Sequence, residues 1–203
     1  MTATSRSESP SGFWVALPDG WVGLDADPKT SAASARRLVE QAARRDETIR
    51  ANKVPLEQML AQVAADAAAS GVVFCACYFQ VFDEQTAVQA SLTVGFHTGE
   101  GNDLASILGG LDDSDGRRLD VVELEAGSAV RRTGRGERAF PGLEEPVEFV
   151  SHQYFLRVPN TTDRVALMSF ASPSVAFEDE LAELFESMAQ SFEFTWRKAR
   201  DGR

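Results

Sequence analysis

The chain has 203 residues, with 31 acidic side chains against 20 basic ones and a formal net charge of -11. At this length it should form one domain and bury about 70% of the surface that its unfolded chain exposes. The negative charge repels nucleic acid and anionic membranes, so we expect neither as a partner.

The N-terminus carries no recognisable targeting signal. Residues 1–12 are rich in Ser and Thr, and they lack both a basic segment followed by an apolar one and a lipobox cysteine. No later segment has the length of continuous apolar sequence that a membrane span needs. We therefore predict a cytoplasmic protein with a disordered tail at 1–11, a single domain at 12–197 and a flexible tail at 198–203.

Two short apolar runs open the predicted domain. Residues 13–17 and 21–24 are separated by Pro18, Asp19 and Gly20, which are residues typical of a tight turn. This pattern predicts an N-terminal hairpin.

Two helices are predicted next. The first begins at Thr30 or Ser31, both competent N-caps, and runs to about Ala51 with an Arg-rich outer face. The second has Pro55 in its first turn and ends before Gly71. Its apolar residues form an almost continuous stripe: Leu56, Met59, Leu60, Val63, Ala64 and Ala67.

The middle of the chain reads as a meander of strands. Residues 72–82 and 86–96 alternate apolar and polar side chains around a short polar turn, which predicts an antiparallel hairpin. Residues 102–111 form a short helix or a loop-borne turn. Residues 119–124 and 129–133 then predict another pair of strands.

Both cysteines lie in the first strand of this meander. Cys75 and Cys77 point to the same face, into packing, because strand side chains alternate with period two. A disulfide across one residue would be strained, and two thiolates are too few for a tetrahedral zinc site. We interpret both as small buried hydrophobic residues.

The last third has the strongest strand and helix patterns. Residues 148–158 predict a half-buried strand, and a polar turn at 160–163 leads to a return strand at 164–171. Because the return strand is apolar on both faces, we expect it inside the sheet.

A C-terminal amphipathic helix follows Pro173. Its apolar stripe is formed by Phe177, Leu181, Leu184, Phe185, Met188 and Phe192. We expect the acidic residues opposite to face solvent. The predicted fold is therefore α+β, a mostly antiparallel sheet of about five to seven strands with an N-terminal helix pair and a C-terminal helix packed on it.

The PDGW turn at 18–21, the long meander, and the closing strand followed by Ser172, Pro173 and the helix at 177–192 resemble the PsbP-like superfamily. That superfamily includes the photosystem II extrinsic protein, a Ran-binding nuclear import factor, LpqN-type lipoproteins and small bacterial secretion adaptors. The resemblance implies a non-enzymatic protein that binds other proteins, without naming a partner.

Four arginines provide the candidate partner site. Arg131, Arg132, Arg135 and Arg138 surround Gly134 and Gly136, with no phosphate-loop sequence after them, so we interpret the segment as a flexible, basic hairpin tip. Arginine suits bidentate contact with carboxylates. We therefore predict that these four side chains dock another protein with an acidic surface.

No catalytic, metal or cofactor site is predicted. His97 and His152 lie in different strands, and no GxSxG sequence is present. The aspartates at 112, 113 and 115 lack the spacing of a calcium loop, which indicates a solvated turn.

Two functions remain open. The leading one is a protein-binding module, such as an adaptor, a secretion chaperone or an immunity-type protein, which should expose an apolar patch. The alternative is a small-ligand-binding protein or an enzyme with an unrecognised site, which should show a deep pocket with convergent polar groups. The oligomeric state is left open.

Overall fold

The computed structural model of the chain describes residues 8–44, 47–82, 87–99, 101–111, 117–139 and 144–196. The predicted aspartate turn at 112–116 and the predicted tail at 198–203 lie outside these residues, as do residues 1–7 of the predicted N-terminal tail. Residues 8–11 are described, and the Glu8 carbonyl accepts hydrogen bonds from Asn160 Nδ2 and Trp196 Nε1.

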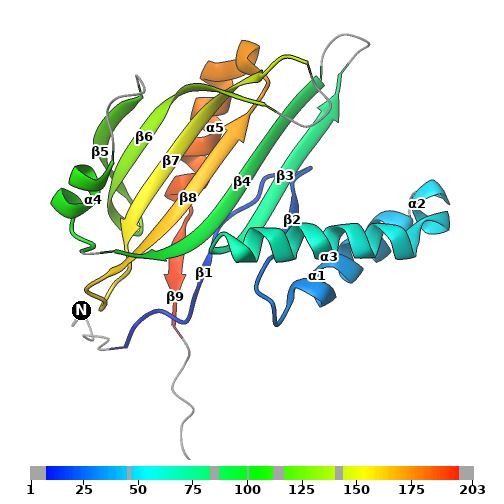
Figure 1. Cartoon of the computed structure of the whole chain (residues 1–203), viewed down its shortest axis with the longest axis horizontal. Coiled ribbons are helices and arrows are strands. Elements are labelled where there is room, and N and C mark those ends of the chain that lie inside the picture. The colour runs from blue at the N-terminus through cyan, green and yellow to red at the C-terminus, as the bar shows by residue number, and fades with distance from the viewer. Residues whose placement is uncertain are drawn as a thin grey trace, which may run out of the picture.

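The main feature of the fold is a seven-stranded antiparallel sheet in the order β2-β3-β4-β8-β7-β6-β5 (Figure 1). Its strands are β2 (Val22–Asp25), β3 (Val72–Val81), β4 (Ala87–Thr98), β5 (Arg118–Leu124), β6 (Gly127–Arg138), β7 (Val147–Arg157) and β8 (Arg164–Ser172). The strand that is apolar on both faces, β8, lies at the centre of the order, which confirms that it is internal.

In the described residues, five α-helices accompany the sheet. They are α1 (Ser31–Ala43), α2 (Glu47–Ala51), α3 (Lys53–Ala69), α4 (Leu104–Gly110) and α5 (Glu178–Gln190), and a short 3₁₀ turn, η1 (Val175–Phe177), precedes α5. The predicted α+β class is confirmed, with helices packed on a mostly antiparallel sheet. Within the described residues, no helix combines the length and the apolar character needed to cross a membrane.

The first predicted helix is shorter than expected. It ends at Ala43 instead of continuing to Ala51. Residues 47–51 form the separate helix α2. Arg50 Nε donates a hydrogen bond to the Ala43 carbonyl at 3.2 Å, so a side chain from α2 satisfies an acceptor that the end of α1 leaves open.

The two faces of the sheet differ in what covers them. The α5 face carries Phe170, which stacks on Phe185 of α5 with ring centroids 4.9 Å apart. The main core lies there, with Leu92, Tyr154 and Met168 among its fully buried side chains. We call the opposite side the open face. In Figure 1 it is turned towards the viewer, with α1 and α3 crossing β2 and β3. At the other end of this face, α4 borders a second hollow together with Phe155 of β7 and Leu167 of β8.

The predicted N-terminal hairpin is wrong. The strand β1 (Gly12–Trp14) pairs with β9 (Glu193–Thr195) in a separate two-stranded sheet, while β2 pairs with β3. The physical reason is aromatic packing, because Phe13 stacks on Phe192 with ring centroids 5.5 Å apart. The two ends of the chain thereby close one end of the core.

Candidate binding groove

An apolar groove lies between the helices α1 to α3 and the open face of β2 to β4. Its cavity volume is about 400 Å³. The lining is almost wholly apolar, with Ser91 and Thr93 as its only hydroxyl-bearing residues; it consists of Val22, Leu24, Leu38, Val39, Ala42, Ile49, Leu56, Met59, Leu60, Val63, Cys75, Ala76, Cys77, Ser91, Leu92 and Thr93. Below, "the groove" means this set of residues.

The groove exists because the helix pair meets the sheet through small side chains. Ala26, Ala35 and Ala64 form a buried cluster with Leu24, and Ala64 is the one buried residue of α3. Small residues permit close approach at that point but cannot fill the space beside it. On α1 the groove residues come after Ala35, and on α3 they come before Ala64. The groove therefore lies on the side of this cluster where α2 connects the two helices.

The groove opens to solvent along apolar side chains. Met59 is 53% exposed and Val63 is 47% exposed, although both belong to the apolar stripe of the second predicted helix. Phe79, two residues beyond Cys77 in β3 and therefore on the same face, is 66% exposed. Clustered exposed apolar side chains are typical of binding sites rather than of an inert surface.

Both thiols line the groove. They point to the same side, as predicted, but Cys77 is exposed and Cys75 is half-buried, so the prediction of two buried cysteines is wrong. Partial desolvation by the surrounding apolar side chains raises the pKa of both thiols above the usual value, and the neighbouring Cys77 and Asp25 add to the rise at Cys75. They are therefore neutral at pH 7 and belong to the apolar lining.

The four candidate arginines do not form a hairpin tip. The strand β6 pairs with β7 from Ala129 to Arg138, so Gly134 and Gly136 lie inside a ladder. The alternation of strand side chains separates the arginines. Arg131 and Arg135 lie on the α5 face, whereas Arg132 and Arg138 occupy positions on the open face.

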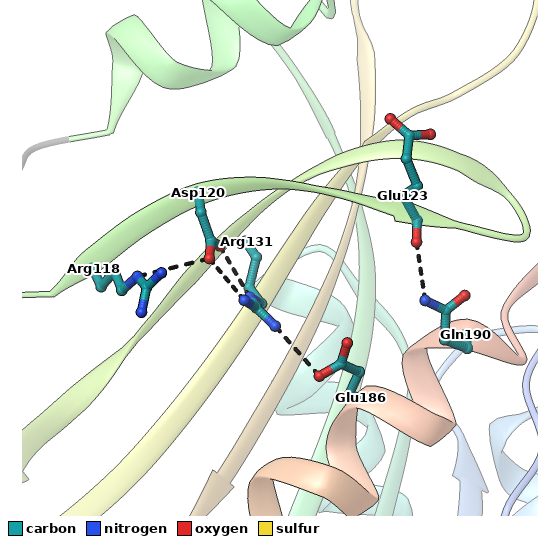
Figure 2. A network of polar contacts seen from close by, with 6 residues as sticks. All are labelled: Arg118, Asp120, Glu123, Arg131, Glu186 and Gln190. Carbon is teal, nitrogen blue, oxygen red and sulfur yellow. Dashed lines mark hydrogen bonds and ion pairs between the residues drawn. The ribbon is translucent and has the colours of Figure 1, made fainter.

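Arg131 holds α5 on the sheet. Its guanidinium donates to Asp120 through Nε at 2.9 Å and Nη2 at 2.7 Å, and its Nη1 lies 3.4 Å from Glu186 of α5 (Figure 2). These hydrogen bonds hold the pKa of Asp120 below its usual value. In the same network, Gln190 of α5 donates to the Glu123 carbonyl at 2.9 Å.

Arg135 makes a second contact of this kind. It donates through Nε to Glu178 of α5 at 2.9 Å and lies 3.4 Å from Glu148. The acidic side of the C-terminal helix faces solvent as expected, with Asp179, Glu180, Glu183 and Glu186 exposed, while Glu178 and Glu186 also make ion pairs with the sheet. Docking of an acidic partner by Arg131, Arg132, Arg135 and Arg138 stays a prediction, and such a partner would have to displace these internal contacts.

The two histidines lie on opposite faces. His152 packs edge-on against Phe185 beneath α5, and its pKa is lowered, first by burial and then by Arg131. His97 is exposed on the open face opposite Val165. In the described part of the chain, no group of three or more His, Cys, Asp or Glu side chains is placed to hold a metal ion.

Comparisons with known proteins give one structural likeness. No family model matches the chain, and no curated protein matches it. The crystal structure of LpqN, which is described as involved in cell envelope biogenesis of Mycobacterium tuberculosis, is similar over 91% of this chain and 86% of that chain. Its TM-score is 0.45 and its sequence identity 13%. Membership of the PsbP-like superfamily stays a prediction.

Proposed function

We propose that the protein is a non-enzymatic binding protein that holds a small lipophilic molecule in the groove. The observation that carries this proposal is an apolar lining around a cavity of about 400 Å³. Ligand sites of proteins commonly enclose roughly 300–1,000 Å³. An apolar guest in the groove would displace water from apolar surface, which favours binding.

The chemistry of the groove favours binding over catalysis. The two thiols are the only groups in the lining that titrate, and their raised pKa values keep them protonated at neutral pH. A guest would gain affinity by burying apolar surface, at about 25 cal/mol per Å². The lining therefore favours apolar ligands. We also propose a cytoplasmic location, as expected from the sequence.

A second candidate is the protein-binding module expected from the sequence: an adaptor, secretion chaperone or immunity-type protein. The exposure of Met59, Val63 and Phe79 beside the groove favours it. The occupant would then be an amphipathic helix of a partner protein, with its apolar face in the groove.

The first test is a titration of the purified protein with the neutral dye Nile red. We expect saturable binding with one dye per chain and slower alkylation of Cys75 and Cys77 by N-ethylmaleimide in the presence of dye, read by mass spectrometry. Ala42→Trp places an indole in the groove and should weaken dye binding about tenfold or more. The matched control, Ala33→Trp, introduces the same side chain at an exposed position of α1 and should bind like the unaltered protein.

Two results would reject the groove as the ligand site. One is the absence of saturable dye binding by the folded protein. The other is dye binding that Ala42→Trp and Ala33→Trp affect equally, because the dye would then bind elsewhere on the surface.

A further inference from the structure

The two cysteines form a pair on the wall of the groove. Cys75 and Cys77 are the only cysteines of the chain, and both are free thiols. They lie two residues apart in β3 and share a face, whereas Ala76 between them points into the main core on the other side of the sheet. After desolvation, the charge of Cys77 is the next cause of the raised pKa of Cys75, so the two sulfur atoms are near neighbours.

Both sulfur atoms are available to a ligand. In the part of the chain that the structure describes, neither thiol takes part in a hydrogen bond or a disulfide. Cys77 is exposed, so a ligand can reach it directly from solvent. Cys75 is half-buried against the cluster of Ala35 and Ala64, where apolar side chains surround it.

The strand sets the separation of the pair. Two residues along a strand rise about 7 Å, and this is the spacing of the two Cβ atoms. Strand side chains commonly take χ1 values near 180° or −60°, which lean them along the strand in opposite directions, so two such thiols can bring their sulfur atoms to about 4–5 Å. A disulfide needs about 2.05 Å and would distort the strand. Two metal–sulfur bonds of about 2.3 Å in line, in contrast, span about 4.6 Å.

The rest of the lining determines which ion suits this pair. The groove residues include no histidine and no charged side chain. An ion that requires four ligands, or that prefers oxygen and nitrogen, therefore finds too few donors there. Thiolates are soft ligands that select Cu(I), and Cu(I) forms linear complexes with two of them. The apolar wall keeps water and other ligands from the ion.

We propose that Cys75 and Cys77 form a two-coordinate site for Cu(I). Binding breaks two S–H bonds, forms two Cu–S bonds and releases two protons to solvent, without electron transfer. The complex carries one negative charge, which stays in contact with water on the side of the exposed Cys77. This site goes beyond the proposed function, because it needs no lipophilic guest.

The test is an oxygen-free titration of the reduced protein with Cu(I) in the presence of bicinchoninate, a coloured chelator that competes for this ion. We expect one Cu(I) per chain. Cys77→Ser leaves one thiolate and should lower the affinity about a hundredfold or more. X-ray absorption at the copper edge should show two sulfur ligands in a linear arrangement.

A matched control keeps two thiols and changes only their spacing. The double variant Cys77→Ser with Phe79→Cys moves the second thiol to an exposed position on the same face of β3. Four residues of strand separate the two thiols by about 13 Å, which is too far for one ion to bridge. This variant should bind Cu(I) no more tightly than Cys77→Ser alone.

Three results would overturn the site. They are a failure of the unaltered protein to take Cu(I) from the chelator, equal affinity of the unaltered protein and the double variant, and one ion shared by two chains. The absorption spectrum of the unaltered protein decides even where a variant does not fold, because three or more ligands would also refute the linear pair. None of these results depends on Nile red binding, so the failure of this site and the failure of the proposed function are distinguishable.

Discussion

Replacement of Arg131 by Met tests whether its ion pair with Asp120 of β5, together with its contact to Glu186 of α5, stabilises the fold. Met retains the apolar stem of the side chain but removes both hydrogen bonds to Asp120 and the contact with Glu186. The Arg131 and Asp120 side chains are 21% and 24% exposed, between a surface pair and a buried one. Surface pairs contribute about 1 kcal/mol or less, and breaking a fully buried pair costs about 3–5 kcal/mol. We therefore expect a loss of about 2 kcal/mol in the free energy of unfolding.

The measurement is urea denaturation followed by circular dichroism. With an m-value of about 2 kcal/mol/M, the midpoint should fall by about 1 M. The matched control is Arg118→Met, because Arg118 Nε lies 3.8 Å from the same carboxylate but its side chain is 78% exposed. It should shift the midpoint by about 0.2 M or less.

A double-mutant cycle decides whether the pair itself causes the loss. Arg131→Met, Asp120→Ala and the double variant should give a coupling energy of more than about 1 kcal/mol. A coupling near zero would refute this reasoning. Arg131 would then stabilise the fold through packing alone.

Two further predictions concern groups that the fold buries. His152 has a lowered pKa, so below about pH 6.5 the unfolded chain binds a proton that the folded chain does not, and stability should fall from that pH down to the lowered pKa. His152→Gln should flatten this part of the stability profile, and a profile that the substitution leaves unchanged would exclude His152 as the cause. Asn102 is 4% exposed and donates through Nδ2 to the carbonyls of Thr161 and Arg164 at 3.0 and 3.1 Å. Asn102→Ala should cost about 2 kcal/mol in a thermal denaturation measurement, and an unchanged melting temperature would show that these carbonyls find other donors.

Local patterns predicted the elements whose partners are close in the sequence. The hairpins β3–β4, β5–β6 and β7–β8 each join adjacent strands, so alternation and turn residues were sufficient to recognise them. The pairing of β1 with β9 joins the two ends of the chain, and no local pattern encodes it. Phe13 and Phe192 stabilise this pairing by stacking on each other. The sequence shows that both are aromatic, but it does not show that they meet in the folded core.

The arginine cluster illustrates a different limit. Composition correctly identified a concentration of positive charge, but the glycines suggested a turn where the structure has a continuous strand. A strand sends neighbouring residues to opposite faces, so one cluster in sequence became two sites in space. Arg131 contributes to the contact with α5, while Arg132 lies on the open face. Considering residues 127–138 as a strand would have revealed this division.

The groove itself could not be predicted from periodicity. The structure has the predicted apolar stripe on α3. Such a stripe shows which side of a helix avoids water, but it does not show whether the facing strands and helices fill the space beside it. Ala35 and Ala64 bring the helices close to Leu24 at one end, whereas Met59 and Val63 remain exposed at the other. An apolar wall that lacks packing partners forfeits dispersion contacts, and a guest that binds only the folded chain restores them and stabilises the fold by mass action. On the proposed function, the groove whose unpacked walls weaken the free protein would also supply the affinity for a guest.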